Sequence, residues 1–77
     1  EVEQTTSQDR IDITVQTKDY VYIIELKLDT SAEEALLQIK EQQYARPFQT
    51  DARKVFLIGV NFSSETRTVE KWVIEEQ

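Results

Sequence analysis

Polar and apolar residues alternate along two neighbouring stretches near the amino end of the chain. In the stretch from Arg10 to Thr17, every second residue is apolar: Ile11, Ile13 and Val15. The stretch from Tyr20 to Leu28 is rich in β-branched and aromatic residues and alternates Tyr22, Ile24 and Leu26 with Val21, Ile23, Glu25 and Lys27. A period of two is typical of a β-strand with two different faces. The pattern therefore predicts a hairpin with Lys18 and Asp19 in its turn.

A helical pattern follows the predicted hairpin. Thr30 and Glu33 have the spacing of a capping box. Apolar residues then recur at helical spacing, at Ala32, Leu36 and Ile39. We predict a helix from Ser31 to Ala45, because Pro47 restricts the residue before it and cannot continue a helix.

The second half of the chain predicts further strands. The stretch from Val55 to Val60 is apolar on both faces, which is expected of a central strand covered from two sides. A strand, a helix and another strand in succession predict a right-handed crossover with parallel pairing. Val69 to Glu75 is predicted as an antiparallel strand near an edge, and Glu1 to Thr6 is a candidate for the end of one more strand. The fold class is therefore α/β, with a mixed sheet that contains a hairpin, a crossover helix and further strands.

The predicted hairpin brings two carboxylates together. If the turn has two residues, the residue numbers of every opposed pair in the hairpin add up to the same total, so Asp12 faces Glu25. A four-residue loop gives the same pairing. A slip of one residue would destroy the match between the apolar faces of the two strands. Directly opposed carboxylates lie about 5 Å apart and repel each other by roughly 3 kcal/mol at an effective dielectric constant of 20. The pair therefore needs a cation.

Two kinds of cation satisfy this requirement. Lys27 lies one step along the same face and Arg10 opposes it, so salt bridges on a solvated sheet face are one interpretation. In the other, Asp12, Glu25 and a backbone carbonyl bind Mg²⁺ or Mn²⁺, which prefer carboxylate and water ligands. Such an ion would activate water and stabilise charge on a phosphate, while the Lys27 ammonium orients the water or the phosphoryl oxygens.

The composition excludes several classes of chemistry. The 77 residues include no cysteine and no histidine, so disulfides, thiolate zinc sites and histidine-based catalysis are excluded. The longest apolar run is far shorter than the roughly 18 residues of a membrane span. The amino end has no signal-peptide pattern, and the absence of cysteine favours a cytoplasmic setting. Because the chain lacks methionine and begins with Glu1, we expect it to be a fragment of a longer protein.

The charge argues against an isolated nucleic-acid binder. Nine basic and 15 acidic residues give a formal net charge of −6, which predicts repulsion from a phosphate backbone. Aromatic residues can also serve as base-stacking platforms, but no basic stripe accompanies them here. We therefore expect the larger aromatic residues to pack in the core or the hairpin: Tyr20, Tyr22, Phe48, Phe56 and Trp72.

The sequence resembles the PD-(D/E)XK nuclease superfamily, and within it the bacterial domains that follow an AAA-like ATPase module. The matching stretches cover nearly the whole chain: Arg10 to Ile13, Tyr20 to Asp29, Ser31 to Leu36, Gln38 to Lys40, Tyr44 to Ala45, and Ile58 to Phe62. The resemblance implies a restriction-endonuclease-like core, truncated at the amino end. It also implies that Asp12, Glu25 and Lys27 are catalytic residues, that Asp12 and Glu25 bind Mg²⁺ or Mn²⁺, and that Gln38 lines the site. A polar residue on a solvated helix face is the alternative interpretation of Gln38.

The function implied by the resemblance is metal-dependent hydrolysis of phosphodiester bonds. The expected partners are nucleic acid, DNA in particular, bound through the parent protein, and an AAA-like ATPase module in the same chain. The alternative is a catalytically inactive nuclease-like module that serves protein interaction or assembly. An exposed edge strand and the lack of a helix before the first strand make homodimerisation a further hypothesis.

Overall fold

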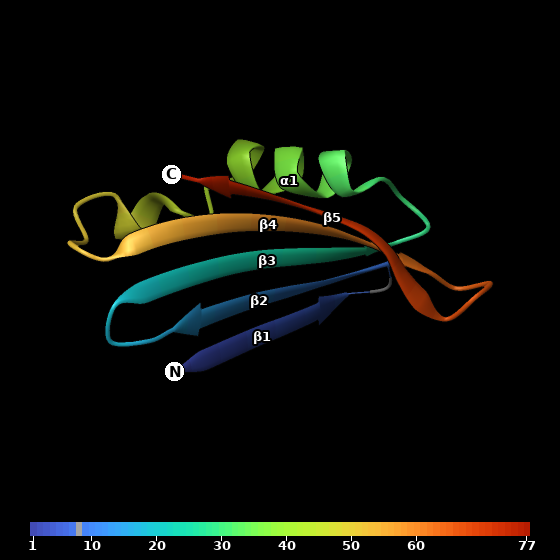
Figure 1. Ribbon diagram of the computed structural model, residues 1–77, viewed down its shortest axis with the longest axis horizontal. Coiled ribbons are helices and arrows are strands. Elements are labelled where there is room, and N and C mark those ends of the chain that lie inside the picture. Colours follow the sequence, from blue (N-terminus) through green and yellow to red (C-terminus); the bar gives the residue numbers. More distant parts are fainter. Residues whose placement is uncertain (8) are drawn as a thin grey trace.

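Residues 1–7 and 9–77 are described by a computed structural model, in which they form five strands and one α-helix (Figure 1). The elements are β1 (Val2–Ser7), β2 (Arg10–Gln16), β3 (Tyr20–Leu28), α1 (Ala32–Glu41), the 3-10 turn η1 (Arg46–Phe48), β4 (Lys54–Ser63) and β5 (Thr68–Glu76). The strands form a single sheet in the order β1-β2-β3-β4-β5. β3 and β4 pair in parallel, and all other pairs are antiparallel. The α/β class, the parallel pairing after the helix and the edge position of the last strand are confirmed.

The hairpin has the predicted register. The backbone N–H of Thr17 donates to the carbonyl of Tyr20 at 2.9 Å, which closes the turn at Lys18 and Asp19. Asp12 pairs with Glu25 along β2 and β3. The candidate strand at the amino end is also present, since β1 pairs with β2 along its full length.

The helix differs from the prediction at both ends. Its N-cap is Ser31, whose Oγ accepts the backbone N–H of Glu34 at 3.1 Å, so the predicted capping box was one residue too early. The helix ends at Glu41 rather than Ala45, because Gln43 adopts a left-handed conformation with φ of 55°. Among the described residues, no helix is long and apolar enough to span a membrane.

α1 covers one face of the sheet by packing on β3, β4 and β5 (Figure 1). The core between the helix and the sheet is a cluster of apolar residues from β3, α1, β4 and the segment that follows the helix: Val21, Ile23, Ile39, Ala45, Val55 and Leu57. The helix approaches β4 most closely at Gly59. A Cβ atom at Gly59 would lie 2.3 Å from the Ala32 carbonyl oxygen and 2.6 Å from the Leu36 nitrogen. A glycine is therefore required for this contact.

The opposite face, which we name the open face, is covered by no other element among the described residues. Its apolar side chains are half-buried or exposed: Ile11, Ile13, Val15, Tyr22, Ile24, Leu26, Phe56, Ile58, Val60, Trp72 and Ile74. The prediction that Val55–Val60 is covered from two sides is therefore wrong for the described part of the chain. The aromatic packing is confirmed for Tyr22 and Phe56, whose rings stack at 5.7 Å, whereas Trp72 is 62% exposed.

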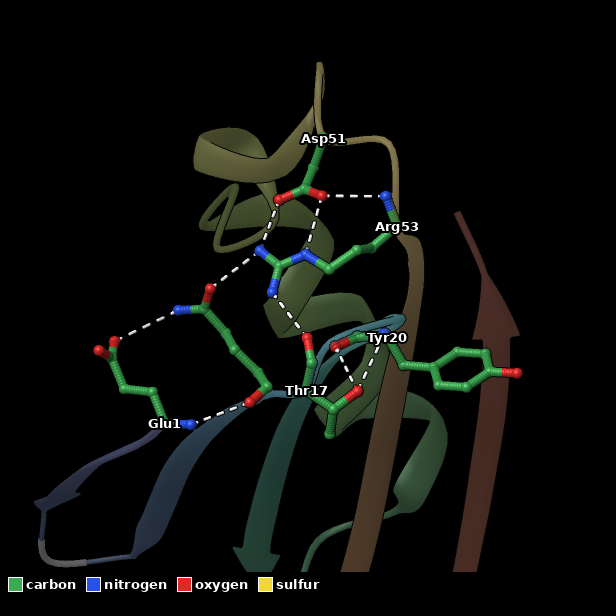
Figure 2. A network of polar contacts seen from close by, with 6 residues as sticks. Glu1, Thr17, Tyr20, Asp51 and Arg53 are labelled. Atoms are coloured by element: carbon green, nitrogen blue, oxygen red, sulfur yellow. Dashed lines mark hydrogen bonds and ion pairs between the residues drawn. The ribbon is translucent and has the colours of Figure 1, made fainter.

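Side-chain contacts fix both ends of the sheet. At one end Arg53 donates to the carboxylate of Asp51, to the Thr17 carbonyl and to Gln16 Oε1, which joins the hairpin turn to the segment before β4 (Figure 2). At the other end Asp29 accepts hydrogen bonds from the N–H and the hydroxyl of Ser64. These contacts hold the hairpin and β4 in a fixed alignment across the sheet.

Candidate metal centre

Two rows of side chains cross the sheet on the face that α1 covers. The first, the carboxylate row, is formed by successive strand partners: Thr5, Asp12, Glu25, Gly59 and Val73. The second, the basic row, lies two residues further along β3 and β4 and contains Arg10, Lys27, Asn61 and Lys71. Because side chains alternate between faces, both rows point to the same side of the sheet. Two acids therefore lie beside three bases and one amide.

Glu25 is fully buried, at 0% exposure, and in its ionised form neither carboxylate oxygen has a hydrogen-bond partner. The burial follows from its neighbour in the row, Gly59, against which the backbone of α1 lies. Burial raises the pKa of Glu25 to about 8. Asp12 acts in the same direction, because its carboxylate accepts a hydrogen bond from the protonated form of Glu25 and repels the ionised form, while the charges of Lys27 and Arg10 act in the opposite direction. An unpaired carboxylate in such a place favours either a proton or a cation.

Asp12 is the more exposed of the two carboxylates. Its Oδ1 is buried without a hydrogen-bond partner, and its Oδ2 lies 3.6 Å from Arg10 Nε. The side chain is 22% exposed and lines a pocket of about 370 Å³. The other polar residues around this pocket are Glu3, Thr5, Arg10, Thr14 and Tyr44. The pocket gives a small ligand access to Asp12 beside the buried carboxylate.

Salt bridges on a solvated face do not account for the pair. Glu25 is not solvated, and the ion pair of Arg10 goes to Asp12. Among the described residues, Lys27 forms no ion pair within 4.0 Å. Lys71, the other base of the row, pairs with Glu33 on α1. The charge that Glu25 would carry is therefore not neutralised by a direct contact.

The structure brings three of the four predicted site residues together. Asp12, Glu25 and Lys27 lie on neighbouring positions of β2 and β3, as the hairpin register predicts. Gln38 is half-buried on α1. The flank of α1 that carries Lys40 contacts β5 through Glu75, and Gln38 lies on the other flank, toward the hairpin. The catalytic and metal-binding roles of these residues remain predictions.

Asn61 is a candidate that sequence reasoning missed. Its Oδ1 is buried without a hydrogen-bond partner, and its amide nitrogen donates to Glu70 at 3.4 Å. It pairs with Lys27 across β3 and β4. The signal in the sequence was a single amide within the otherwise apolar run from Val55 to Phe62. A polar residue on the buried face of a strand needs a partner, whether protein, water or ligand.

The donor atoms fit a hard divalent cation. Three buried oxygens without partners belong to the paired carboxylates, one on Asp12 and two on Glu25, and Mg²⁺ and Mn²⁺ prefer carboxylate, carbonyl and water oxygens. In the described part of the chain, no three side chains of His, Cys, Asp or Glu are grouped to hold a metal. The carboxylates alone therefore supply two protein ligands, and the remaining positions would go to water and carbonyl oxygens.

Comparison with known proteins decides the family. Residues 1–72 match the sequence profile of a family that is described as "PD-(D/E)XK nuclease superfamily". The chain belongs to the PD-(D/E)XK nuclease superfamily. The resemblance drawn from the sequence is thus confirmed at this level, and the mixed sheet with its covering helix is consistent with a restriction-endonuclease-like fold. Nucleases of the PD-(D/E)XK superfamily generally use divalent metal ions, in agreement with the oxygen-rich site.

The chain also matches part of a much longer protein. The chain is 38% identical over 76 residues to an "Uncharacterized protein in vnfD 5'region" from Azotobacter chroococcum mcd 1. The alignment covers 96% of this PD-(D/E)XK chain and 15% of the relative, so the chain spans about one seventh of that protein. No solved structure gives a significant match.

Proposed function

We propose that this chain contributes the metal-binding core of a nuclease that hydrolyses phosphodiester bonds of nucleic acid, with DNA as the expected substrate. The observation that carries the proposal is the pairing of Asp12 with the buried, unpartnered carboxylate of Glu25. Membership of the superfamily supports it. Since the chain spans about 15% of its relative, the substrate and an AAA-like ATPase module are proposed for the longer protein.

Each residue has a distinct task in this proposal. Asp12 and Glu25 would hold Mg²⁺ or Mn²⁺, which supplies the Lewis acid that activates water and neutralises charge on the scissile phosphate. Lys27, which lies in the next row and forms no ion pair among the described residues, donates hydrogen bonds to the attacking water or to the phosphoryl oxygens. Arg10 holds Asp12 and adds positive charge beside the pocket. Gln38 is proposed to contact the substrate or its water from α1.

Metal binding and nuclease activity test the proposal together. Mn²⁺ binding is measured by calorimetry on the chain, and cleavage of supercoiled plasmid, single-stranded DNA and RNA on the longer protein. Asp12→Asn and Glu25→Gln should abolish both, and Lys27→Met should abolish cleavage while binding persists. Asp19→Asn and Glu34→Gln are matched controls, because both acids are exposed and lie away from the rows. Binding that is unchanged in Asp12→Asn and Glu25→Gln would refute the metal site.

A second candidate function is a catalytically inactive module that assembles with a second copy of itself. The open face favours it, because contiguous apolar surface of this extent marks an interaction site. Five strands about 4.8 Å apart and about 25 to 30 Å long give a footprint of roughly 600 to 700 Å². That area is close to the roughly 800 Å² per partner of a stable interface. The net charge of −6 also weakens nucleic-acid binding by the isolated chain.

Sedimentation velocity tests this second candidate. Ile74 lies on the open face and is 57% exposed, whereas Leu37 is 52% exposed on the outer side of α1. A dimer that dissociates in Ile74→Lys but persists in Leu37→Lys would support assembly through the open face. A monomeric wild-type chain at high concentration would exclude the second copy, and the open face would then belong to another part of the longer protein or to another partner.

A further inference from the structure

Lys27 and Asn61 are direct partners on β3 and β4, on the face of the sheet that α1 covers. Neighbouring strands lie about 4.8 Å apart, so the side chains of paired residues begin within reach of each other. The Lys27 ammonium has three N–H donors and forms no ion pair in the described part of the chain. The Asn61 Oδ1 is a buried acceptor without a hydrogen-bond partner there. A cation without a counter-ion and an acceptor without a donor therefore occupy adjacent positions.

The Asn61 amide is oriented from the edge strand β5. Its Nδ2 donates to Glu70 Oε2 at 3.4 Å. β4 lies between β5 and β3 in the sheet, and the nitrogen and oxygen of a planar amide point in different directions. With Nδ2 held on the β5 side, Oδ1 is the end of the amide that can face β3 and Lys27.

Lys71 is the other base beside Asn61, and its charge is already paired. It is the β5 partner of Asn61. Its ammonium forms an ion pair with Glu33 on α1, and its side chain is 59% exposed. The acceptor of Asn61 is therefore left to Lys27.

A hydrogen bond to Lys27 answers a physical need of the proposed reaction. Lysine carries a point charge on a flexible stem of four carbons. Glu25 lies two residues earlier on the same strand face, about 6.6 Å away along the strand, and attracts the ammonium toward the place of the cation. An acceptor within the basic row opposes this displacement. The ammonium then stays where phosphoryl oxygens or the attacking water can accept hydrogen bonds from it.

We infer that Asn61 is the positioning residue of Lys27: its Oδ1 accepts a hydrogen bond from the ammonium and holds the charge in the basic row. The flexible stem of Lys27 allows the ammonium to reach this oxygen from the neighbouring strand. The inference rests on the proposed function, because the contact affects cleavage only if Lys27 acts on the substrate or its water. It gives a task to a buried amide that the two-carboxylate metal site does not use.

The contact itself is tested by a spectrum that needs no activity. Asn61 is the single asparagine of the sequence, so ¹³C labelling of asparagine gives one side-chain Cγ signal. Lys27→Met should move this signal upfield, because the amide oxygen loses its donor. Lys54→Met, at an exposed lysine that begins β4, is the control and should leave the signal in place. No shift in Lys27→Met, or a shift at least as large in Lys71→Met, would overturn the inference.

Cleavage of nucleic acid by the longer protein tests the consequence of the contact. Asn61→Leu replaces the amide with an apolar group of similar size. This variant should lower kcat about tenfold to a hundredfold, because the ammonium is present but misplaced, while KM and Mn²⁺ affinity stay near the wild-type values. Asn61→Asp combined with Glu70→Gln exchanges donor and acceptor between these two side chains, keeps an acceptor beside Lys27, and should restore most of kcat. Gln42→Leu, at an exposed amide that follows α1, is the control.

The outcomes separate this inference from the proposed function. If the wild-type protein cleaves and Asn61→Leu has the same kcat, the positioning role is refuted and the proposed function stands. If the wild-type protein neither binds Mn²⁺ nor cleaves, the proposed function fails, and the Cγ signal still decides whether Lys27 contacts Asn61. The spectrum of Lys27→Met also remains decisive where Asn61→Leu does not fold, because that variant leaves the amide in place.

Discussion

Gly59 pairs with Glu25 across β3 and β4, and the missing side chain at Gly59 allows α1 to close over the carboxylate row. The helix backbone lies so near that a Cβ atom would be 2.3 Å from the Ala32 carbonyl oxygen. Glu25 is consequently excluded from solvent. One glycine thus couples the packing of the fold to the electrostatics of the candidate site.

Gly59→Ala should destabilise the protein and open the site. Because the clashing atoms belong to the helix backbone, α1 must shift, and overpacking of this kind costs about 1 to 3 kcal/mol. Urea unfolding measures the loss. Glu25 should also regain water, which lowers its pKa toward the ordinary range. Thr50→Ala, at an exposed loop position, is the control, and a Gly59→Ala chain as stable as that control would show that the helix contact is unimportant.

The metal-free protein should lose stability as the pH rises from about 4.5 to about 8. The pKa of Glu25 is raised from 4.5 to about 8 in the folded state, so in this interval the folded chain holds a proton that the unfolded chain has released. The stabilisation is complete below 4.5 and is lost as the pH passes 8. Urea unfolding in the presence of a chelator measures the trend, and Glu25→Gln should remove it. The same trend in Glu25→Gln would assign it to another group.

Divalent metal should stabilise the folded chain. A ligand that binds only the folded state adds about 2.7 kcal/mol at a concentration of 100 times its Kd, so Mn²⁺ should raise the Tm. The increase should be larger at pH 8 than at pH 6, because the ion must displace the proton of Glu25. Asp12→Asn should abolish the response and Asp19→Asn should retain it. An equal response in both variants would indicate non-specific binding to the acidic surface.

Arg53→Ala should destabilise the chain more than Arg46→Ala does. Arg53 binds Asp51, the Thr17 carbonyl and Gln16 at 2.6 to 3.0 Å (Figure 2). Arg46, by comparison, has one 3.4 Å contact with Gln43. The midpoint of urea unfolding measures the difference. Arg53→Lys should recover only part of the lost stability, because a lysine ammonium cannot reproduce the hydrogen bonds of the planar guanidinium group. Equal midpoints for the two alanine variants would show that the network contributes little.

The same network should give the folding stability a second pH dependence, in the acidic range. The hydrogen bonds of Arg53 lower the pKa of Asp51 from 3.8 to about 2. A lowered carboxyl pKa contributes stability above the unfolded value of 3.8, and this contribution is lost as the pH falls toward 2. Acid unfolding of wild type and Asp51→Asn should therefore diverge above pH 4 and converge near pH 2. Parallel curves throughout would mean that Asp51 is not held by Arg53 in solution.

The local pattern of residues determined the hairpin and the carboxylate pair. Alternation from Arg10 to Thr17 and from Tyr20 to Leu28 fixes which side chains share a face, and only one register matches the apolar faces. Asp12 therefore had to face Glu25. Side-chain periodicity and a short turn are local properties, which is why the sequence was sufficient here.

The positions of the helix ends depended on details that periodicity does not contain. Ser31 rather than Thr30 caps α1, because its hydroxyl reaches the N–H of Glu34. The left-handed conformation of Gln43 stops the helix at Glu41 although the apolar spacing continues. Neighbouring residues can have similar ability to cap a helix. Which of them becomes the cap depends on how the chain enters and leaves the sheet.

Only the tertiary structure decided how the site is enclosed. The burial of Glu25 depends on contact between α1 and Gly59, and the place of Asn61 beside Lys27 depends on parallel pairing of β3 with β4. Gly59 lies 18 to 27 residues after the residues of α1, and the partners in β3 and β4 are 34 residues apart, so no local pattern contains these contacts. The apolar positions of β4 likewise did not reveal that one face is open. Sequence alone thus specified which residues share a strand face, and long-range packing determined which of them lose contact with water.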